Sequence, residues 1–240
     1  MNHSSRIWAI VPAAGTGFRM GSSQPKQYLT LAGRAVMVHT LERLCSHPRI
    51  EGVLVGLAAE DRDWASLKDA IARLPMFLGT YEGGAERADT VLNGLRALGA
   101  NADPADWVMV HDAARPCIRH EDIDRLIRET QDHPDGGLLA LPVADTVKRT
   151  DSTQHVQETV PRTHLWRALT PQLFPLERLT GALEQALAAG ATVTDEAAAI
   201  EHTGGHPRVV AGHADNIKIT LADDLALAEL FLKQQEREHA

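Results

Sequence analysis

The chain has 240 residues, of which 44% are hydrophobic, and carries a formal net charge of −8. This length and composition predict one α/β domain over residues 1–240 with a full buried core. The negative charge disfavours nucleic-acid and anionic-membrane partners, so any ligand-binding cations must be local. Because the apolar runs are shorter than a membrane span and the first six residues lack a signal core, we expect a cytoplasmic protein.

The first predicted strand, Ile7–Ala14, runs into a glycine-rich stretch that is followed by two cations. Gly15 and Gly17 leave the backbone bare, and Arg19 and Lys26 add fixed positive charge. Exposed N–H groups beside cations are suited to a polyphosphate. The spacing is not that of a Walker A loop, and the third glycine comes one residue too late for a dinucleotide fingerprint. The stretch therefore favours a nucleotide-phosphate loop over a plain turn.

Strand-like and helical patterns then alternate along the chain. Further strands are predicted at Gly52–Ala58, Trp107–His111, Leu138–Val143, Arg208–Ala211 and Ile217–Thr220. Helical spacing is seen for Met37, Leu41 and Leu44, and for Val91, Leu95 and Leu98. This alternation predicts a Rossmann-like, doubly wound and mostly parallel sheet, whose ligands lie beyond the carboxyl ends of the strands.

A last helix is predicted from Leu221 to Glu238. Its apolar face would carry Leu227, Leu230 and Phe231, and its cap would be the pair Thr220 and Asp223.

One stretch interrupts the alternation. Residues Asp145–Arg149 and Glu158–Val160 read as short strands around the polar segment Thr150–Gln157. This pattern predicts a β-hairpin arm, over about residues 143–165, that lies outside the core and pairs with another surface.

The cysteines and histidines suggest no metal centre. Cys45 lies on an apolar helix face and is predicted to be a core residue, whereas Cys117 follows a loop and is expected to be incidental. The twelve histidines are scattered without a metal-binding spacing, and only His111 lies near suspected chemistry.

Eight strings in order give the chain a family resemblance. They are residues 13–21, Pro25–Tyr28, Gly83–Val91, Val110–Pro116, Asp145–Lys148, Leu165–Gln172, Thr194–Ala197 and Ala214–Lys218. The chain resembles the 2-C-methyl-D-erythritol 4-phosphate cytidylyltransferases of the non-mevalonate isoprenoid pathway. The resemblance implies that CTP and methylerythritol 4-phosphate react to give 4-diphosphocytidyl-2-C-methyl-D-erythritol and pyrophosphate.

The resemblance also implies site residues. Arg19 and Lys26 match cations that stabilise the triphosphate and the transition state, and Arg162 and Lys218 match those that hold the acceptor phosphate. The predicted CTP contacts are Ala13, Ala14, Gly15, Thr16, Gly17, Gly83, Gly84 and Thr90. The predicted acceptor contacts are Asp112, Arg115, Thr146 and Thr170. For Asp112, an aspartate that caps its own turn is the structural alternative.

Two further expectations concern partners. The triphosphate implies Mg²⁺ or another divalent cation, for which Asp112 and Asp215 are candidate ligands. The family implies a homodimer with shared active sites, in which Arg162, and also Thr146, reach the partner's site.

Several alternatives remain open on the sequence. A ribitol-5-phosphate cytidylyltransferase shares the fold, CTP and the mechanism, although that family tends to begin its loop with Ala-Gly-Gly rather than Ala13-Ala14-Gly15. A non-catalytic nucleotide-sensing module is disfavoured because Lys26 and Lys218 are both present. Glycine spacing and Arg19 disfavour an NAD-dependent dehydrogenase.

Overall fold

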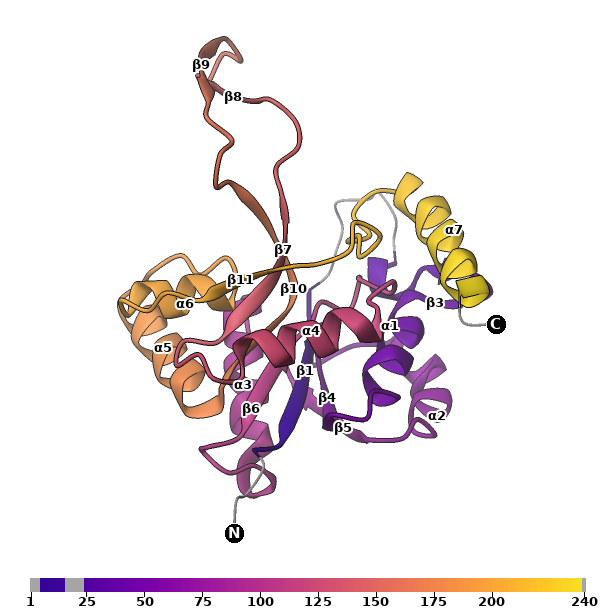
Figure 1. The fold of residues 1–240 in the computed structure, drawn as a ribbon. Coiled ribbons are helices and arrows are strands. Elements are labelled where there is room, and N and C mark those ends of the chain that lie inside the picture. The colour runs from indigo at the N-terminus through magenta and orange to yellow at the C-terminus, as the bar shows by residue number, and fades with distance from the viewer. Residues whose placement is uncertain (1–4, 16–23, 239–240) are drawn as a thin grey trace.

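The computed structural model describes residues 5–15 and 24–238, which form a central sheet of seven strands. In sheet order these are β11 (Arg208–Ala211), β7 (Gly137–Pro142), β10 (Trp166–Pro175), β6 (Trp107–Val110), β1 (Ile7–Pro12), β4 (Ile50–Leu57) and β5 (Phe77–Glu82). All neighbours pair in parallel except β10, which runs antiparallel to both β6 and β7. The predicted mostly parallel, doubly wound fold is confirmed (Figure 1).

Strand β1 shows why both faces of the sheet are covered. Successive side chains of a strand point to opposite faces. Ile7, Ala9 and Val11 join one apolar cluster, while Trp8 and Ile10 join another. Since all five are buried, the strand reads as a continuous apolar run, which is typical of a parallel sheet between two helical layers.

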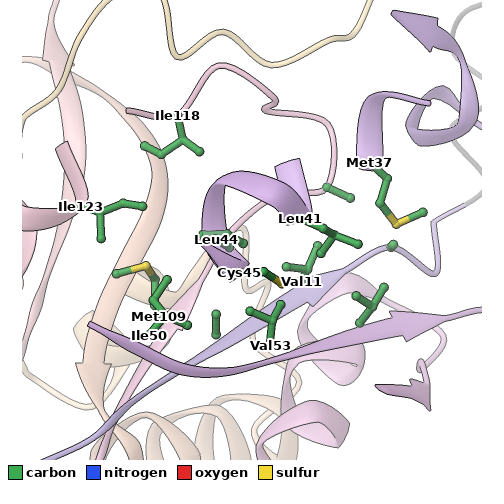
Figure 2. Packing of buried hydrophobic residues seen from close by; sticks show 14 of the residues in the cluster. Val11, Met37, Leu41, Leu44, Cys45, Ile50, Val53, Met109, Ile118 and Ile123 are labelled. Carbon is green, nitrogen blue, oxygen red and sulfur yellow. The ribbon is translucent and has the colours of Figure 1, made fainter. Parts of the chain in front are cut away.

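The helices supply these two layers. The first cluster packs α1 (Val36–Cys45), α2 (Lys68–Ile71) and α4 (His120–Thr130), and the second packs α3 (Arg87–Leu98), α5 (Leu176–Ala188) and α6 (Glu196–His202). Figure 2 shows Leu41, Leu44 and Cys45 of α1 over Val11 and Val53 of the sheet. Within the described ranges, no helix is both long enough and apolar enough to cross a membrane.

In the described part of the chain, five short elements lie in the connections between these strands and helices. They are β2 (Thr30–Leu31), β3 (Arg34–Ala35), and the 3-10 turns η2 (Lys26–Tyr28), η3 (Trp64–Ser66) and η4 (Gly99–Asn101).

Five of the six predicted strands are confirmed, with ends that shift by one or two residues. Strands β5 and β10 were not predicted, because each contains a residue that weakens a strand pattern: Gly79 in β5 and Pro171 in β10.

The predicted strand Ile217–Thr220 is wrong. The segment has an irregular backbone, which is held by neighbouring loops rather than by a strand ladder. The Ile219 N–H donates to the Ala114 carbonyl at 2.8 Å, and the Arg115 guanidinium donates to the Asn216 carbonyl at 2.8 Å. The apolar pattern of the segment reflects burial of Ile219, not pairing in the sheet.

The last helix, α7 (Asp223–Glu238), is present, but its predicted face and cap are right only for Phe231, which packs against the core beneath the helix, and for Thr220, which takes part in the cap. Ala228, Leu232 and Gln235 are its buried residues, whereas Leu227 and Leu230 are exposed. The capping carboxylate belongs to Asp224, which accepts from the backbone N–H of Thr220 at 2.7 Å. Because Leu31, Val36 and Cys117 form the surface beneath α7, the tertiary contacts choose the buried face.

The hairpin arm is confirmed. Strands β8 (Val147–Thr150) and β9 (Val156–Val160) pair antiparallel, and the hairpin projects away from the body (Figure 1). At its base the Val143 N–H donates to the Leu165 carbonyl at 3.0 Å.

The two cysteines are both core residues. Cys45 is buried as predicted. The expectation for Cys117 is wrong, because it is completely buried under α7, with its thiol 3.6 Å from the Ala228 carbonyl oxygen.

Candidate active site

A cavity of about 940 Å³ lies where loops after β1, β5, β6 and β11 meet. Its lining comprises Pro12, Ala13, Ala14, Gly15, Lys26, Gln27, Gly84, Ala85, Glu86, Arg87, Thr90, Asp112, Ala113, Ala114, Lys218 and Thr220. The cavity therefore lies beyond the carboxyl ends of these strands, where the sequence predicts the ligands. Predicted residues Thr16, Gly17 and Arg19 lie outside the described residues.

The loop after β1 is fastened by a side chain that the sequence reasoning did not single out. The buried Gln27 amide donates to the carbonyl oxygens of Ala13 at 2.9 Å and of Gly15 at 3.3 Å. Its neighbour Lys26 opens η2 and lines the cavity. Gln27 thus ties the turn that carries Lys26 to the start of the glycine-rich loop.

The Gly83–Gly84 turn closes a second wall. A Cβ atom on Gly83 would lie 2.4 Å from Ala14 Cβ, so glycine permits the turn to pack against the loop after β1. The Gly84 N–H donates to Thr90 Oγ1 at 3.0 Å, and Glu86 and Asp89 form a reciprocal capping box at the start of α3. The turn is therefore set by its own backbone and caps.

Asp112 is the centre of charge on the third wall. Its Oδ1 lies 3.3 Å from both Nε and Nη2 of Arg87, while Oδ2 lies 2.9 Å from Lys218 Nζ and 3.4 Å from Arg115 Nε. Burial alone would raise the pKa of Asp112, but Arg87, Lys218 and Arg115 outweigh it and hold the pKa well below its usual range. Asp112 is therefore a carboxylate at neutral pH, with three cations around it.

Behind Arg87 stands a buried carboxylate, that of Glu196. Arg87 Nη1 and Nη2 donate to Glu196 Oε1 and Oε2 at 2.5 and 3.2 Å. Burial raises the pKa of Glu196, and the two-pronged contact with Arg87 opposes that shift. Neither Arg87 nor Glu196 was predicted as a site residue. Each lies inside one of the eight strings, but a separation of 109 positions along the chain hides the pair from any local pattern.

His111 and Thr170 support Asp112 from below. Thr170 Oγ1 accepts the Asp112 N–H at 3.0 Å and lies 3.0 Å from His111 Nδ1. Burial lowers the pKa of the fully enclosed His111 to about 4, so its imidazole is neutral at pH 7. His111 therefore acts as a hydrogen-bonding partner of the loop and not as a charged group facing a ligand.

The structure does not bring every predicted site residue to the cavity. Arg115 and Thr170 are buried beside it, where Arg115 donates to the Asn216 carbonyl. Asp215 accepts at Oδ2 from Arg119 at 2.7 Å and from Gln235 at 2.9 Å, and is absent from the lining. Thr146 and Arg162 belong to the exposed arm and its base, and Arg162 Nη1 donates to the Ala144 carbonyl.

The resulting geometry is suited to polyanions. Lys26 and Lys218 enter one cavity from different segments, and Arg87 adds a third cation whose side chain is 29% exposed. Backbone from Gly15 and Gly84 lines the space between them. Such a cavity can hold two phosphate-bearing ligands together and offset negative charge that builds up between them.

The comparisons with known proteins agree with this geometry. The family model for 2-C-methyl-D-erythritol 4-phosphate cytidylyltransferase matches residues 7–234. Proteins of that name from Shewanella amazonensis and Vibrio vulnificus are 53% and 50% identical over 234 and 228 residues. Those matches cover 98% and 95% of this chain, and 96% and 95% of the relatives.

Solved structures are similar over the same length. A crystal structure of a 4-diphosphocytidyl-2C-methyl-D-erythritol synthase has a TM-score of 0.82 and 35% identity, covering 95% of this chain and 99% of its own. The Francisella tularensis 2-C-methyl-D-erythritol 4-phosphate cytidylyltransferase has a TM-score of 0.78 and 33% identity, covering 95% and 100%. The chain therefore belongs to the 2-C-methyl-D-erythritol 4-phosphate cytidylyltransferase family.

Proposed function

We propose that this chain transfers the cytidylyl group of CTP to 2-C-methyl-D-erythritol 4-phosphate and releases pyrophosphate. The observation that carries the proposal is one cavity in which Lys26, beside the glycine-rich loop, and Lys218, paired with Asp112, both take part. A reaction between a triphosphate and a phosphomonoester needs two cationic binding sites in one cavity, one for each substrate. Family membership supplies the identity of the two substrates.

The reaction is an in-line displacement. A phosphate oxygen of the acceptor forms a bond to the α-phosphorus of CTP, and the bond from that phosphorus to the bridging oxygen of pyrophosphate breaks. Because the acceptor phosphate is already an anion, no strong general base is required. Lys26 and Arg19 stabilise the triphosphate and the crowded α-phosphorus, and Lys218 holds the incoming phosphate in line. Arg115 and Thr170 support Asp112 and the Lys218 segment from behind.

We infer that Mg²⁺ enters the site with the triphosphate, because no group of three or more His, Cys, Asp or Glu side chains among the described residues could hold the ion by itself. Mg²⁺ commonly takes phosphate oxygens, waters and one or two carboxylates. Asp112 lines the cavity with a charged carboxylate, while Asp215 faces Arg119 and Gln235. Of the two predicted ligands, Asp112 is the one that lines the cavity, and a bound ion would neutralise phosphate charge there. Because Arg87, Lys218 and Arg115 already contact the Asp112 oxygens, the ion would have to take the place of one of these contacts.

The active enzyme is a homodimer in which each arm completes the partner's site. The dimer is supported by the position of the arm in the single chain, because none of its residues from 143 to 165 lines the described cavity. Yet the arm carries Arg162, the match to a family cation, at its base, and Val156 on the hairpin is 60% exposed. Exchange of arms about a two-fold axis would cover the hairpin edges and deliver Arg162 and Thr146 to the other cavity.

The cytoplasmic location expected from the sequence stays a prediction.

The proposed function is tested by pyrophosphate release. The full-length chain is assayed with CTP and Mg²⁺ against methylerythritol 4-phosphate, ribitol 5-phosphate and a sugar 1-phosphate at equal concentration. We expect turnover with methylerythritol 4-phosphate and a CDP-alcohol product. Faster turnover with ribitol 5-phosphate would move the chain to that acceptor, and no turnover with any acceptor would favour a nucleotide-sensing module.

A further inference from the structure

We propose that Glu196 and Arg87 are positioning residues that orient the Asp112 carboxylate and, through it, the Lys218 ammonium group. The four side chains form an alternating row of charges from a buried helix start to the cavity: Glu196, Arg87, Asp112 and Lys218. This inference rests on the proposed function, because it assigns to Lys218 the acceptor phosphate.

Arg87 is engaged on two edges at once. Its Nη1 and Nη2 donate to the two oxygens of Glu196, and its Nε donates to Asp112 Oδ1, from which Nη2 also lies 3.3 Å. A planar guanidinium with five N–H donors can hold two carboxylates in fixed relative positions, which a lysine ammonium cannot do in the same way. Glu196 is 1% exposed, so no solvent competes for its oxygens.

The contact divides the two oxygens of Asp112. Arg87 holds Oδ1, so Oδ2 is turned toward Lys218 at 2.9 Å and toward Arg115 Nε at 3.4 Å. The Lys218 side chain is 38% exposed and lines the cavity, so its ammonium group can exchange Asp112 for a ligand phosphate without leaving the site. The position of that ammonium group is therefore set by a carboxylate that Arg87 orients.

The row of charges also connects the proposed binding site of the acceptor phosphate with the turn that the sequence predicts to bind CTP. Arg87 is the first residue of α3, directly after the Gly83–Gly84 turn and its cap. The turn itself is held by Thr90 Oγ1 and by the capping box of Glu86 and Asp89, not by the Arg87 side chain. Changes to the Arg87 or Glu196 side chain should thus disturb the acceptor place while the nucleotide turn keeps its shape.

Three full-length variants test the inference: Glu196→Gln, Arg87→Lys and the double variant Arg87→Gln with Glu196→Gln. Glu196→Gln should lower kcat/KM for methylerythritol 4-phosphate about tenfold or more, because the attacking group is misplaced. The Kd of CTP alone, measured by calorimetry, should change less than about twofold. Arg87→Lys keeps the positive charge but loses the planar guanidinium that holds both carboxylates. It should therefore lower kcat/KM for methylerythritol 4-phosphate in the same way.

The double variant separates positioning from stability. It removes both buried charges together, so its thermal midpoint should return toward that of the wild type. The acceptor defect should remain, because the Arg115 contact to Oδ2 does not replace the contact by which Arg87 holds Asp112 Oδ1. If acceptor kcat/KM recovers together with the thermal midpoint, the pair is merely structural and the inference is overturned. This variant also decides the question if Glu196→Gln does not fold.

Asp135→Asn is the matched control. Asp135 pairs with Arg178 at 3.2 Å, is largely buried and lines no part of the cavity. It should change stability without changing kcat/KM for the acceptor.

Crystal structures of the wild type and of the double variant provide a readout that needs no turnover. The contact between Asp112 Oδ2 and Lys218 Nζ should be lost in the double variant. If it persists unchanged, the inference fails even in an active enzyme. A wild type that transfers no cytidylyl group would instead refute the proposed function, and the structures would still decide whether Glu196 and Arg87 orient Asp112.

Discussion

The Gln27 side-chain amide donates to the Ala13 carbonyl at 2.9 Å, which joins the turn bearing Lys26 to the loop that follows β1. Gln27 is 4% exposed, so this contact is shielded from water. The uncharged Gln27 thereby fixes the backbone position from which Lys26 enters the cavity.

Gln27→Leu should destabilise the fold and slow catalysis together. The carbonyls of Ala13 and Gly15 lose their donor, which costs about 1–3 kcal/mol of unfolding free energy when a buried acceptor is left unpaired. Chemical denaturation and kcat would both be measured. The control is Gln234→Leu, since the exposed Gln234 side chain donates to Glu238 one turn along α7, away from the cavity lining. A normal kcat in Gln27→Leu would show that Lys26 is placed without it.

Lys26→Ala should reduce kcat about a hundredfold or more. Loss of one preorganised contact to transition-state charge costs on the order of 3 kcal/mol. The effect should fall on kcat, with a smaller change in CTP affinity. Lys233→Ala, on the exposed face of α7 where Lys233 pairs with Glu229, should leave both values unchanged. Near-normal kcat in Lys26→Ala would remove Lys26 from the transition state.

Mixed dimers of Arg162→Ala and Lys26→Ala chains should recover activity that neither homodimer has. If the arm delivers Arg162 to the partner, each heterodimer contains one site with both cations, and regains up to about half of the wild-type activity. Subunit exchange is followed with two affinity tags, and activity is measured on the doubly tagged fraction. A heterodimer that stays inactive would place Arg162 in the site of its own chain.

Stability should fall as the pH drops from about 6.5 toward 4, partly through His111. Burial lowers the pKa of His111 in the folded chain from 6.5 to about 4, so over this range the unfolded state binds the proton and the folded state does not. At pH values below about 4, this difference in the pKa of His111 lowers the free energy of unfolding by about 3 kcal/mol. Above pH 6.5, His111 is neutral in both states and does not change the free energy of unfolding.

Urea denaturation between pH 7.5 and 4.5 measures this slope. His111→Asn should flatten it, while the part due to His39 and His47, whose pKa values burial also lowers, should remain. An unchanged slope in His111→Asn would show that His111 titrates alike in both states.

Local patterns in the sequence determined much of this protein. The apolar runs of β1, β4 and β6 predict buried parallel strands, because a strand covered on both faces must be apolar on both. Glycines followed by Lys26 predict a phosphate-binding place, since bare backbone and charge are local properties. The alternating charged runs around residues 150–157 predict the arm, because a hairpin pairs neighbouring residues.

Tertiary structure alone decided which residues meet. The Ile217–Thr220 segment has strand-like composition, but contacts from Ala114 and Arg115 hold it as a loop. The buried face of α7 follows the surface beneath it, so Leu227 and Leu230 are left exposed.

The same holds for charge. Glu196 and Arg87 are 109 residues apart, and they pair beside Asp112 because α5 packs against both α3 and α6 and so brings the starts of these two helices together. Spacing along a chain reports one strand face or one helix turn, whereas a buried ion pair depends on which loops the whole sheet brings to one edge.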